Sequence, residues 1–289
     1  MTLKIEIRHR SDQSASILAS AGKTDLAIKA GTVIEIDGRE HRFGTDTAVI
    51  FGDLVPGQDY GIGLDQARQP FAVPVASNPL GAEWFAGFHF APGGCAEGRG
   101  GGNSVPAINP YSIWDIGFRP TCPDPRGMAL IEADGGRRFW SDIYLLGVDH
   151  KENGTSRYGA EIADGRSLPL LDHGTAVEIC ASHGKRLLTY DEFRAAAFGV
   201  TEKSSAARDP KSTGLDAPRT SKFGLMQATG NLWIWGADGD PDDPRPSLFG
   251  GSWLGGSSAG SRFAVLVYWG GDSDESIGCR AASDHMGPA

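Results

Sequence analysis

The chain opens with alternating hydrophobic and polar residues. Leu3, Ile5 and Ile7 are separated by charged side chains, which is the two-residue period of a half-buried strand. Asp37-Gly38 lies between two short apolar runs, and this pair is favoured in the tight turn of a β-hairpin. Residues 1–90 are therefore predicted to form a β-rich domain, a small sandwich or roll. Its further strands are expected at 33–36, 39–43, 48–51, 60–64 and 71–75.

Helical spacing occurs only in the second half of the chain. Apolar residues at intervals of three and four predict a helix over 175–183, which ends at Gly184. Thr189 and Glu192 have the spacing of a capping box and predict a second helix that ends at Gly199. The residues that follow have no helical pattern and are rich in Gly, Trp, Ser and Asp. The predicted fold class is therefore α+β.

The most glycine-dense stretch, residues 91–104, separates these two parts. Glycine makes up 41 of the 289 residues, which indicates many tight turns on an ordered scaffold. The stretch does not have the spacing of a dinucleotide-binding loop, and no Gly-Lys-Ser or Gly-Lys-Thr follows it. We expect a linker or surface loop at 91–104 and a separate domain at 105–289.

Charge and hydropathy exclude several classes of function. The 27 Lys and Arg residues face 36 Asp and Glu, a net charge of −9, which argues against a nucleic-acid partner. Mean hydropathy is −0.25. No apolar run reaches the roughly 18 residues of a membrane-spanning helix, so membrane insertion is not expected. The first residues also lack the apolar core of a secretory signal peptide, so no such peptide is expected.

No residue pattern defines a metal or cofactor site. Four Asp residues within 238–243 have calcium-like spacing, but Phe249 stands where a calcium loop needs Glu. A solvated acidic turn is the favoured interpretation, and Ca²⁺ binding is the alternative. The four cysteines have no paired spacing and are expected to be free thiols, with a disulfide as the alternative. We therefore expect no cofactor and no metal site.

Four motifs in the second half of the chain follow one another in a known order. Their sequences are GKRLLTYDEF, GNLWIW, GGSW and IGCR, and they lie at 184–193, 230–235, 250–253 and 277–280. This series resembles the formylglycine-generating-enzyme subtype of the C-type lectin fold. The resemblance implies that residues 105–289 form a C-type lectin-like domain.

Further segments narrow the resemblance to the major tropism determinant family of bacteriophages. The similar segments lie at 139–146, 153–159, 162–165, 260–262 and 284–285. Proteins of this family are receptor-binding proteins whose surface is diversified by a diversity-generating retroelement. The resemblance implies a phage or prophage tail protein that forms a homotrimer and is located on the virion tail or in the cytoplasm. Residues 1–90 would then serve attachment or assembly.

The cysteine pair of the enzymes with this fold subtype is missing. Those enzymes bind copper through two cysteines, and thiolate suits Cu(I) because both are soft. Gly255 and Gly260 stand at the corresponding positions, and Cys279 is the only cysteine near them in the sequence. A shared fold does not carry activity without its site. We expect a binding protein and not an enzyme; a formylglycine-generating oxidase and a fixed structural tail protein are the alternatives.

The resemblance also implies which residues vary. Variable positions in such proteins come from Asn codons mutated at adenine, which cannot yield Lys, Glu, Gln, Met or Trp. No gap is needed between Gly250 and His285, so the positions can be transferred one by one. Twelve residues of permitted types are expected to bind a protein or glycan ligand. They are Ser252, Leu254, Gly255, Gly256, Ser258, Val265, Val267, Tyr268, Asp272, Asp274, Ser276 and Ile277.

Residues of the forbidden types between these positions are expected to be constant. A surface whose side chains change must take its shape from neighbours that do not change. We expect tryptophans to pack beneath this surface and arginines to donate hydrogen bonds to the carbonyls of its loops. The predicted scaffold residues are Trp233, Trp235, Trp253, Arg262, Trp269 and Arg280.

Overall fold

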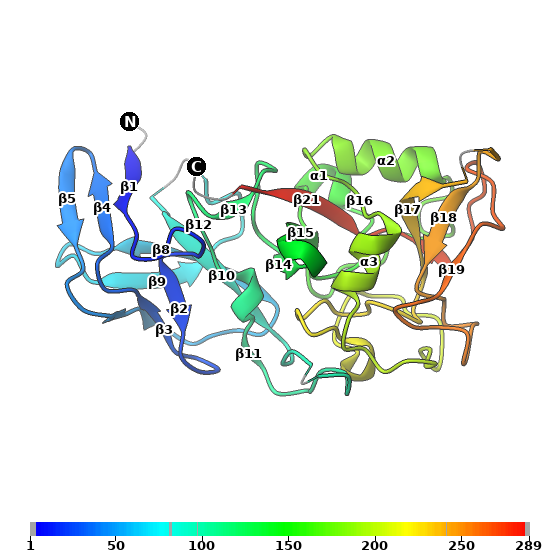
Figure 1. Ribbon diagram of the computed structural model, residues 1–289, viewed down its shortest axis with the longest axis horizontal. Coiled ribbons are helices and arrows are strands. Elements are labelled where there is room, and N and C mark those ends of the chain that lie inside the picture. The colour runs from blue at the N-terminus through cyan, green and yellow to red at the C-terminus, as the bar shows by residue number, and fades with distance from the viewer. Residues whose placement is uncertain (1–3, 81–82, 97, 241, 287–289) are drawn as a thin grey trace.

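The computed structural model describes residues 4–80, 83–96, 98–240 and 242–286. Most of its regular structure is β-sheet, and the helices are few and short (Figure 1). The N-terminal sheets form one end of an elongated molecule, and the irregular loops that follow β18 (Pro246–Phe249) form the other end. Within the described residues, no helix is long and apolar enough to cross a membrane.

The N-terminal region contains three sheets, as the alternating pattern predicts. The first has the order β1-β4-β5, the second β2-β3-β6 and the third β11-β10-β8-β9-β7, with β12 also paired to β10. Tyr60 and Phe88 stack in the shared core, with ring centroids 5.2 Å apart. The strands are β1 (Ile5–His9), β2 (Leu18–Ser20), β3 (Leu26–Ile28), β4 (Val33–Ile36), β5 (Arg39–Arg42), β6 (Thr47–Ala48), β7 (Ile50–Phe51), β8 (Gln58–Leu64), β9 (Pro70–Pro74), β10 (Ala86–Ala91), β11 (Ala107–Ile108) and β12 (Trp114–Asp115).

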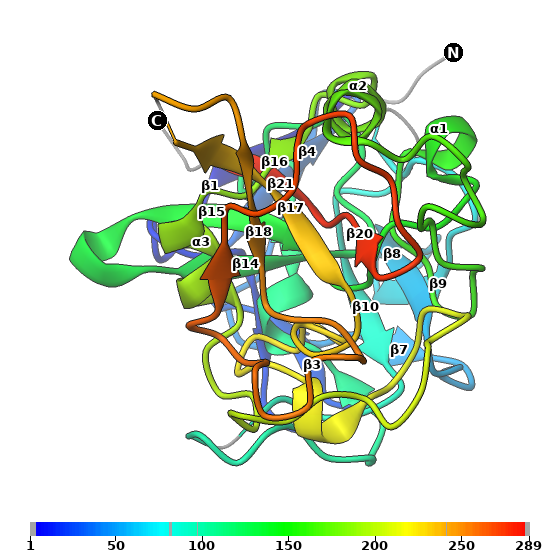
Figure 2. The same cartoon turned by 90° about the vertical axis from the view of Figure 1, so that its right-hand side faces the viewer.

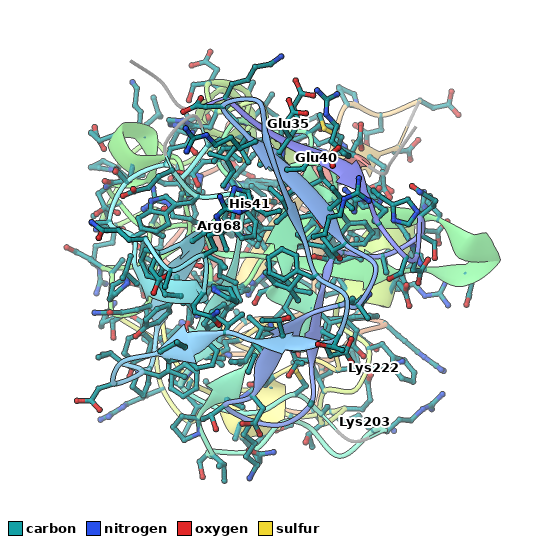
Figure 3. All side chains as sticks on the ribbon, turned by 90° about the vertical axis from the view of Figure 1, so that its left-hand side faces the viewer. Glu35, Glu40, His41, Arg68, Lys203 and Lys222 are labelled. Atoms are coloured by element: carbon teal, nitrogen blue, oxygen red, sulfur yellow. The ribbon has the colours of Figure 1, made fainter. Side chains whose placement is uncertain are left out.

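The predicted hairpin is confirmed between β4 and β5. Asp37 and Gly38 both have positive φ, 49° and 80°, as a two-residue turn of this kind requires. Glu35, Glu40 and His41 lie on this hairpin at the N-terminal end of the molecule (Figure 3). The local sequence was therefore sufficient to define this element.

The strands on the two sides of the glycine-dense stretch, residues 91–104, belong to one sheet. β11 and β12 follow the glycine-dense stretch, yet both pair with β10 of the N-terminal sheet. The stretch itself is a docked loop and not a linker, because Gly101 donates a backbone hydrogen bond of 2.7 Å to Gly199. The N-terminal sheet therefore extends beyond residues 91–104 and includes residues as far as Asp115 of β12.

Two sheets organise the C-terminal part. One has the order β13-β21-β15-β14, with β16 also paired to β21, and the other has the order β19-β18-β17-β20. β21 is thus an inner strand although it follows all the others in the chain. The strands are β13 (Arg119–Pro120), β14 (Met128–Glu132), β15 (Arg138–Asp142), β16 (Arg186–Leu187), β17 (Trp233–Gly239), β18, β19 (Ala264–Val265), β20 (Ile277–Gly278) and β21 (Ala281–Met286).

Both predicted helices are present. The first, α2 (His173–Ala181), begins two residues earlier than predicted because the side chain of Asp172 accepts the N–H of Thr175. The second, α3 (Tyr190–Ala196), begins with the predicted capping box of Thr189 and Glu192. The short helices that the sequence pattern does not predict are α1 (His150–Asn153), η1 (Pro110–Ser112), η2 (Asp134–Gly136) and η3 (Ala217–Arg219).

A buried polar chain joins the two parts of the molecule. His89 of β10 is hydrogen-bonded to Asp59 of β8 at 3.1 Å and to the hydroxyl of Tyr144, beyond β15, at 2.9 Å. Asp59 also accepts the backbone N–H of Gly127 at 3.1 Å. Burial raises the pKa of Tyr144 well above its ordinary value, so the phenol stays protonated. The N-terminal sheet is therefore tied to the C-terminal part by hydrogen bonds as well as by packing.

Candidate ligand-binding surface

The segment between β18 and β20, residues 250–276, covers the end of the molecule opposite the N-terminal sheets. Figure 2 faces this end and shows the segment as long loops in front of the β17–β18 sheet. Its only regular strand among the described residues is β19, which pairs with β18. Because β18 and β20 both pair with β17, the segment is held at its beginning and at its end. We call residues 250–276 the displayed segment.

Glycine fixes the path of the chain where the displayed segment begins. Gly251 has a φ of 79°, and a Cβ at this position would lie 2.7 Å from the Cα of Ala259. Gly250 donates to the carbonyl of Phe263 at 2.9 Å, and Trp253 donates to the carbonyl of Asn231 at 2.9 Å. These bonds join backbone groups, so they do not depend on which side chains the loop carries.

Glu202 supports the first loop of the displayed segment from outside. Its carboxylate accepts the backbone N–H of Ser261 at 3.1 Å and also the hydroxyl of the same residue. A Cβ on Gly260, which has a φ of 152°, would clash with this carboxylate. No motif in the sequence points to Glu202, which lies outside all of them and far from the loop along the chain.

The second loop of the displayed segment rests on residues 164–173. Gly165 donates to the carbonyl of Asp274 at 3.1 Å, and His173 donates to the carbonyl of Gly270 at 3.0 Å. Arg166 and Glu275 form an ion pair beside these bonds. The backbone of this loop is therefore also held from outside.

Nine of the twelve predicted variable residues are exposed or partly exposed. Leu254 and Val267 each have 64% of their surface exposed. The structure thus brings these nine residues to one end of the molecule, although it does not show that they vary. The nine are Leu254, Gly255, Gly256, Ser258, Val265, Val267, Tyr268, Asp272 and Asp274.

The other three predicted variable residues are buried. Ile277 is fully buried because it lies opposite Trp233 in the pairing of β20 with β17, and its side chain packs in the core. Ser252 and Ser276 are 2% and 4% exposed. In this structure, these three residues cannot contact a ligand through their side chains. The spacing argument could not detect this, because it carries no information on strand register.

The predicted scaffold residues fall into two groups. Trp235 is fully buried, and its indole N–H donates to the carbonyl of Leu171 at 3.3 Å. Trp233 and Trp253 are only partly buried, and they pack at the edges of two core clusters. Arg262 and Trp269 differ from the other predicted scaffold residues. Both are exposed, and the recorded hydrogen bond at Arg262 uses its carbonyl, which accepts the hydroxyl of Tyr190.

Arg280 is buried and donates hydrogen bonds to backbone carbonyls of the interior. Its guanidinium is 1% exposed and donates to the carbonyls of Asp142, Ile143, Met226 and Gln227 at 2.5–3.2 Å. Burial lowers its pKa to about 10, so the group remains charged at neutral pH. One side chain therefore holds two separate loops in the interior.

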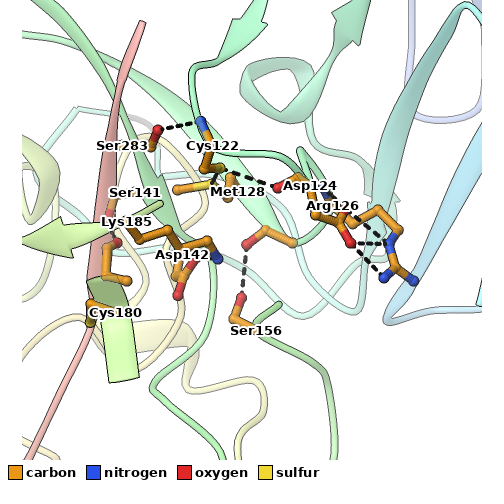
Figure 4. A network of polar contacts seen from close by, with 12 residues as sticks. Cys122, Asp124, Arg126, Met128, Ser141, Asp142, Ser156, Cys180, Lys185 and Ser283 are labelled. Atoms are coloured by element: carbon orange, nitrogen blue, oxygen red, sulfur yellow. Dashed lines mark hydrogen bonds and ion pairs between the residues drawn. The ribbon is translucent and has the colours of Figure 1, made fainter. Parts of the chain in front are cut away.

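A buried ion pair lies close to Arg280 in the C-terminal core. Lys185 contacts Asp142 at 2.8 Å, and neither side chain is exposed (Figure 4). Burial raises the pKa of Asp142, and the charge of Lys185 opposes this change. The pair is enclosed by packed side chains, which suits a structural role better than contact with a ligand.

The cysteines do not form the oxidase site. All four are free, and the thiols of Cys180 and Cys279 lie 3.8 Å apart, a contact that the sequence analysis did not predict. Both thiols are fully buried in the core below α2, whereas Gly255 and Gly260 stand at the positions of the oxidase pair. No group of three or more His, Cys, Asp or Glu side chains in the described ranges has the arrangement of a metal site.

Three of the Asp side chains at 238–243 each contact a different group. Asp238 accepts the backbone N–H of Tyr190 at 2.9 Å, and this bond lies at the start of α3. Asp240 accepts the N–H of Asp242, and Asp243 pairs with Arg245 at 3.0 Å. Ca²⁺ binding needs six or more oxygen ligands around one point, and these described side chains do not converge in that way.

A mostly β chain that holds a long irregular segment by its backbone has an architecture consistent with C-type lectin-like binding proteins. Comparison with solved structures identifies a narrower group of similar proteins. The M1 variant of the major tropism determinant matches with a TM-score of 0.89 at 36% identity, over 98% of this chain and 86% of that chain. The U1 variant matches with a TM-score of 0.88 at 35% identity, over 96% and 86% of the two chains.

Sequence comparison agrees. The tail fiber receptor-binding protein of Bordetella phage BPP-1 is 37% identical over 324 aligned positions, which cover 96% of this chain and 84% of the relative. A family model described as "Mtd second domain" matches residues 16–115, which end where β12 ends. The chain belongs to the major tropism determinant family, and the resemblance found in the sequence is confirmed.

Proposed function

We propose that this chain is a receptor-binding protein of a phage or prophage tail. Its displayed segment would carry the residues that a diversity-generating retroelement changes. The observation that carries the proposal is the backbone support of this segment from Asn231, Gly165 and His173, none of which lies within it. A loop held in this way can change its exposed side chains without losing its shape.

The fold subtype and the assembly belong to the same proposal. The order of the four sequence motifs supports the formylglycine-generating-enzyme subtype of the C-type lectin fold for the C-terminal part. The relatives are receptor-binding proteins by name, which supports a non-enzymatic role, a host receptor as partner and a place on the virion. We further propose a homotrimer, because several modest sites on one particle give useful avidity. The N-terminal part would then serve attachment or assembly.

The test is deep sequencing of the gene segment that encodes residues 250–285, across a population of the source phage or host. We expect substitutions at the codons of the nine exposed or partly exposed positions, with Trp253, Trp269 and Arg280 constant. Any change at Ile277 should be restricted to apolar residues, because polar groups are costly in a packed core.

Invariant codons, together with no adenine-bearing template copy of the segment nearby, would contradict diversification and favour a fixed structural tail protein. Oxidation of a cysteine-containing sulfatase peptide by the purified chain would contradict the non-enzymatic role. Light scattering on the purified chain would test the trimer independently of both.

A further inference from the structure

Trp269 is exposed in the middle of residues that are proposed to vary. Its side chain has 52% of its surface exposed, and Val267, Tyr268 and Asp272 lie close to it in the sequence. Mutation of the adenines in an Asn codon cannot produce the Trp codon. If the proposed function holds, on which this inference rests, Trp269 is a constant residue on a changing surface.

We propose that Trp269, together with Arg245, forms a constant anchor that contacts every ligand of the displayed segment. Variable neighbours would then decide which ligand binds, and the anchor would supply a share of the affinity that all ligands have in common. Trp and Arg are the residue types most enriched at the energetically dominant positions of protein interfaces. A Trp side chain offers a large rigid contact area, because only two torsions must be fixed on binding.

The two side chains are stacked on each other before any ligand binds. The guanidinium carbon of Arg245 lies 4.5 Å from the centroid of the Trp269 ring, within the range of a cation–π contact. Arg245 is also held by its ion pair with Asp243 and by a long hydrogen bond of 3.5 Å to the carbonyl of Leu266. Arg245 precedes the displayed segment, so the proposed diversification does not reach it.

The backbone beneath Trp269 keeps its position when its neighbours change. Asp272 donates its N–H to the carbonyl of Trp269 at 3.0 Å, and His173 donates to the carbonyl of Gly270 at 3.0 Å. Both are backbone bonds, so they persist when residue 272 varies. The side chain of Asp272 adds a third bond by accepting the N–H of Trp269 at 2.8 Å, and only this one is lost.

The surroundings of the anchor favour the apolar part of a ligand. Leu266 and Val267 are 41% and 64% exposed, and they directly precede Tyr268 and Trp269 in the chain. An exposed Trp flanked by exposed aliphatic side chains gains free energy when a ligand removes this area from water.

The experiment uses the full chain, with the nine exposed or partly exposed variable positions randomised to the codons that adenine mutation allows. Binders are selected by mRNA display against three unrelated probes: purified lysozyme, serum albumin and streptavidin. Each selected binder is then remade as Trp269→Ser, Trp269→Phe and Ile50→Ser. Ile50 is the matched control, because it is 56% exposed but lies on β7 of the N-terminal sheet.

We expect Trp269→Ser to weaken every binder at least about tenfold in Kd, whichever probe it binds, as for an interface hot spot. Trp269→Phe should retain part of the affinity, and Ile50→Ser should change it less than about twofold, as a site outside the interface would. Thermal unfolding should differ little among the three variants, because both positions are exposed.

Two results would overturn the anchor and leave the proposed function standing. One is a loss of affinity that occurs for some probes only, or for none. The other is a change of oligomeric state in Trp269→Ser, seen by light scattering, which would place Trp269 in a subunit contact. If the folded library yields no binder to any probe, the proposed function itself is contradicted, and the anchor with it.

Discussion

Arg280 shows how much of this fold can depend on one residue. It donates to four carbonyls in two loops that are far apart in the sequence. Backbone carbonyls that are buried without a donor are costly, and a neighbouring buried carboxylate, Asp142, adds to that cost. The side chain therefore acts as a substitute for secondary structure where the loops have none.

Replacement of Arg280 should strongly destabilise the protein. We expect Arg280→Met to lower the free energy of unfolding by about 3–5 kcal/mol, because four buried carbonyls lose their donor and the buried Asp142 carboxylate loses a nearby positive charge. Urea denaturation followed by circular dichroism measures this loss. Arg262→Met is the control and should stay within about 0.5 kcal/mol of the parent, because Arg262 is exposed. Equal effects of the two substitutions would show that burial does not set the role of Arg280.

His150 makes the stability depend on pH. It is fully buried, and neither ring nitrogen has a hydrogen-bond partner among the described residues. Burial lowers its pKa from 6.5 to about 2, so it is neutral when folded and becomes protonated below pH 6.5 when unfolded. The unfolded state then binds more protons, and stability falls as the pH is lowered from 6.5 towards 2.

The expected size of this effect is measurable. Between pH 7 and pH 5, His150 should remove about 2 kcal/mol from the free energy of unfolding. His150→Gln cannot titrate, so its loss over the same interval should be smaller by that amount. Urea titrations at pH 7, 6 and 5 compare the two proteins. The assignment to His150 fails if both proteins lose the same stability.

At the scale of elements, the turn after β18 is the most constrained part of the displayed segment. Gly251 has a φ of 79° and no room for a Cβ, because the backbone of Ala259 lies in the way. Gly256 also has a positive φ, 54°, but nothing lies within 4 Å of its Cβ position. Two glycines of one loop are therefore required for different reasons.

This difference predicts unequal costs. Gly251→Ala should destabilise the protein by about 3 kcal/mol, since it adds a backbone clash to the strain of a left-handed conformation. Gly256→Ala should cost only about 1 kcal/mol, which is the conformational strain alone. Thermal unfolding of both variants measures the difference. Equal costs would mean that the loop can move away from Ala259.

Elements defined by neighbouring residues were predictable from the sequence, and those defined by distant contacts were not. The Asp37-Gly38 turn and the Thr189–Glu192 capping box each need only a few adjacent residues, and both are present. β11 and β12 pair with β10 across the glycine-dense loop, and this pairing could not be read from composition.

The same distinction between local and distant contacts applies to the candidate ligand-binding surface. Family spacing located the displayed segment, but it could not tell that Ile277 points into the core or that Trp269 points out of it. Both facts depend on how β20 and the second loop lie against β17 and residues 164–173.

At the scale of the whole molecule, the Asp59–His89–Tyr144 chain joins the two parts into one unit. All three side chains are buried or nearly so, and each hydrogen bond links residues that are far apart in the sequence. The displayed segment lies at the other end of the molecule (Figures 1 and 2).

We expect the N-terminal and C-terminal parts of the molecule to unfold together in a single calorimetric transition. Tyr144→Phe should lower the stability by about 1–2 kcal/mol, because it leaves a buried imidazole nitrogen of His89 without its partner. Tyr158→Phe is the control, since Tyr158 is 46% exposed, and it should have little effect. Two separate transitions in the parent protein would show that the junction does not couple the two parts.

The position of β21 has a consequence for the synthesis of the protein. β21 lies between β13 and β15, and it is translated after the displayed segment. A stop codon or frameshift that arises within the displayed segment therefore removes an inner strand of the sheet, and the C-terminal part cannot close. We expect such truncated or frameshifted copies not to fold, and so not to enter an assembly. Folding of the C-terminal part therefore depends on an intact reading frame through the displayed segment.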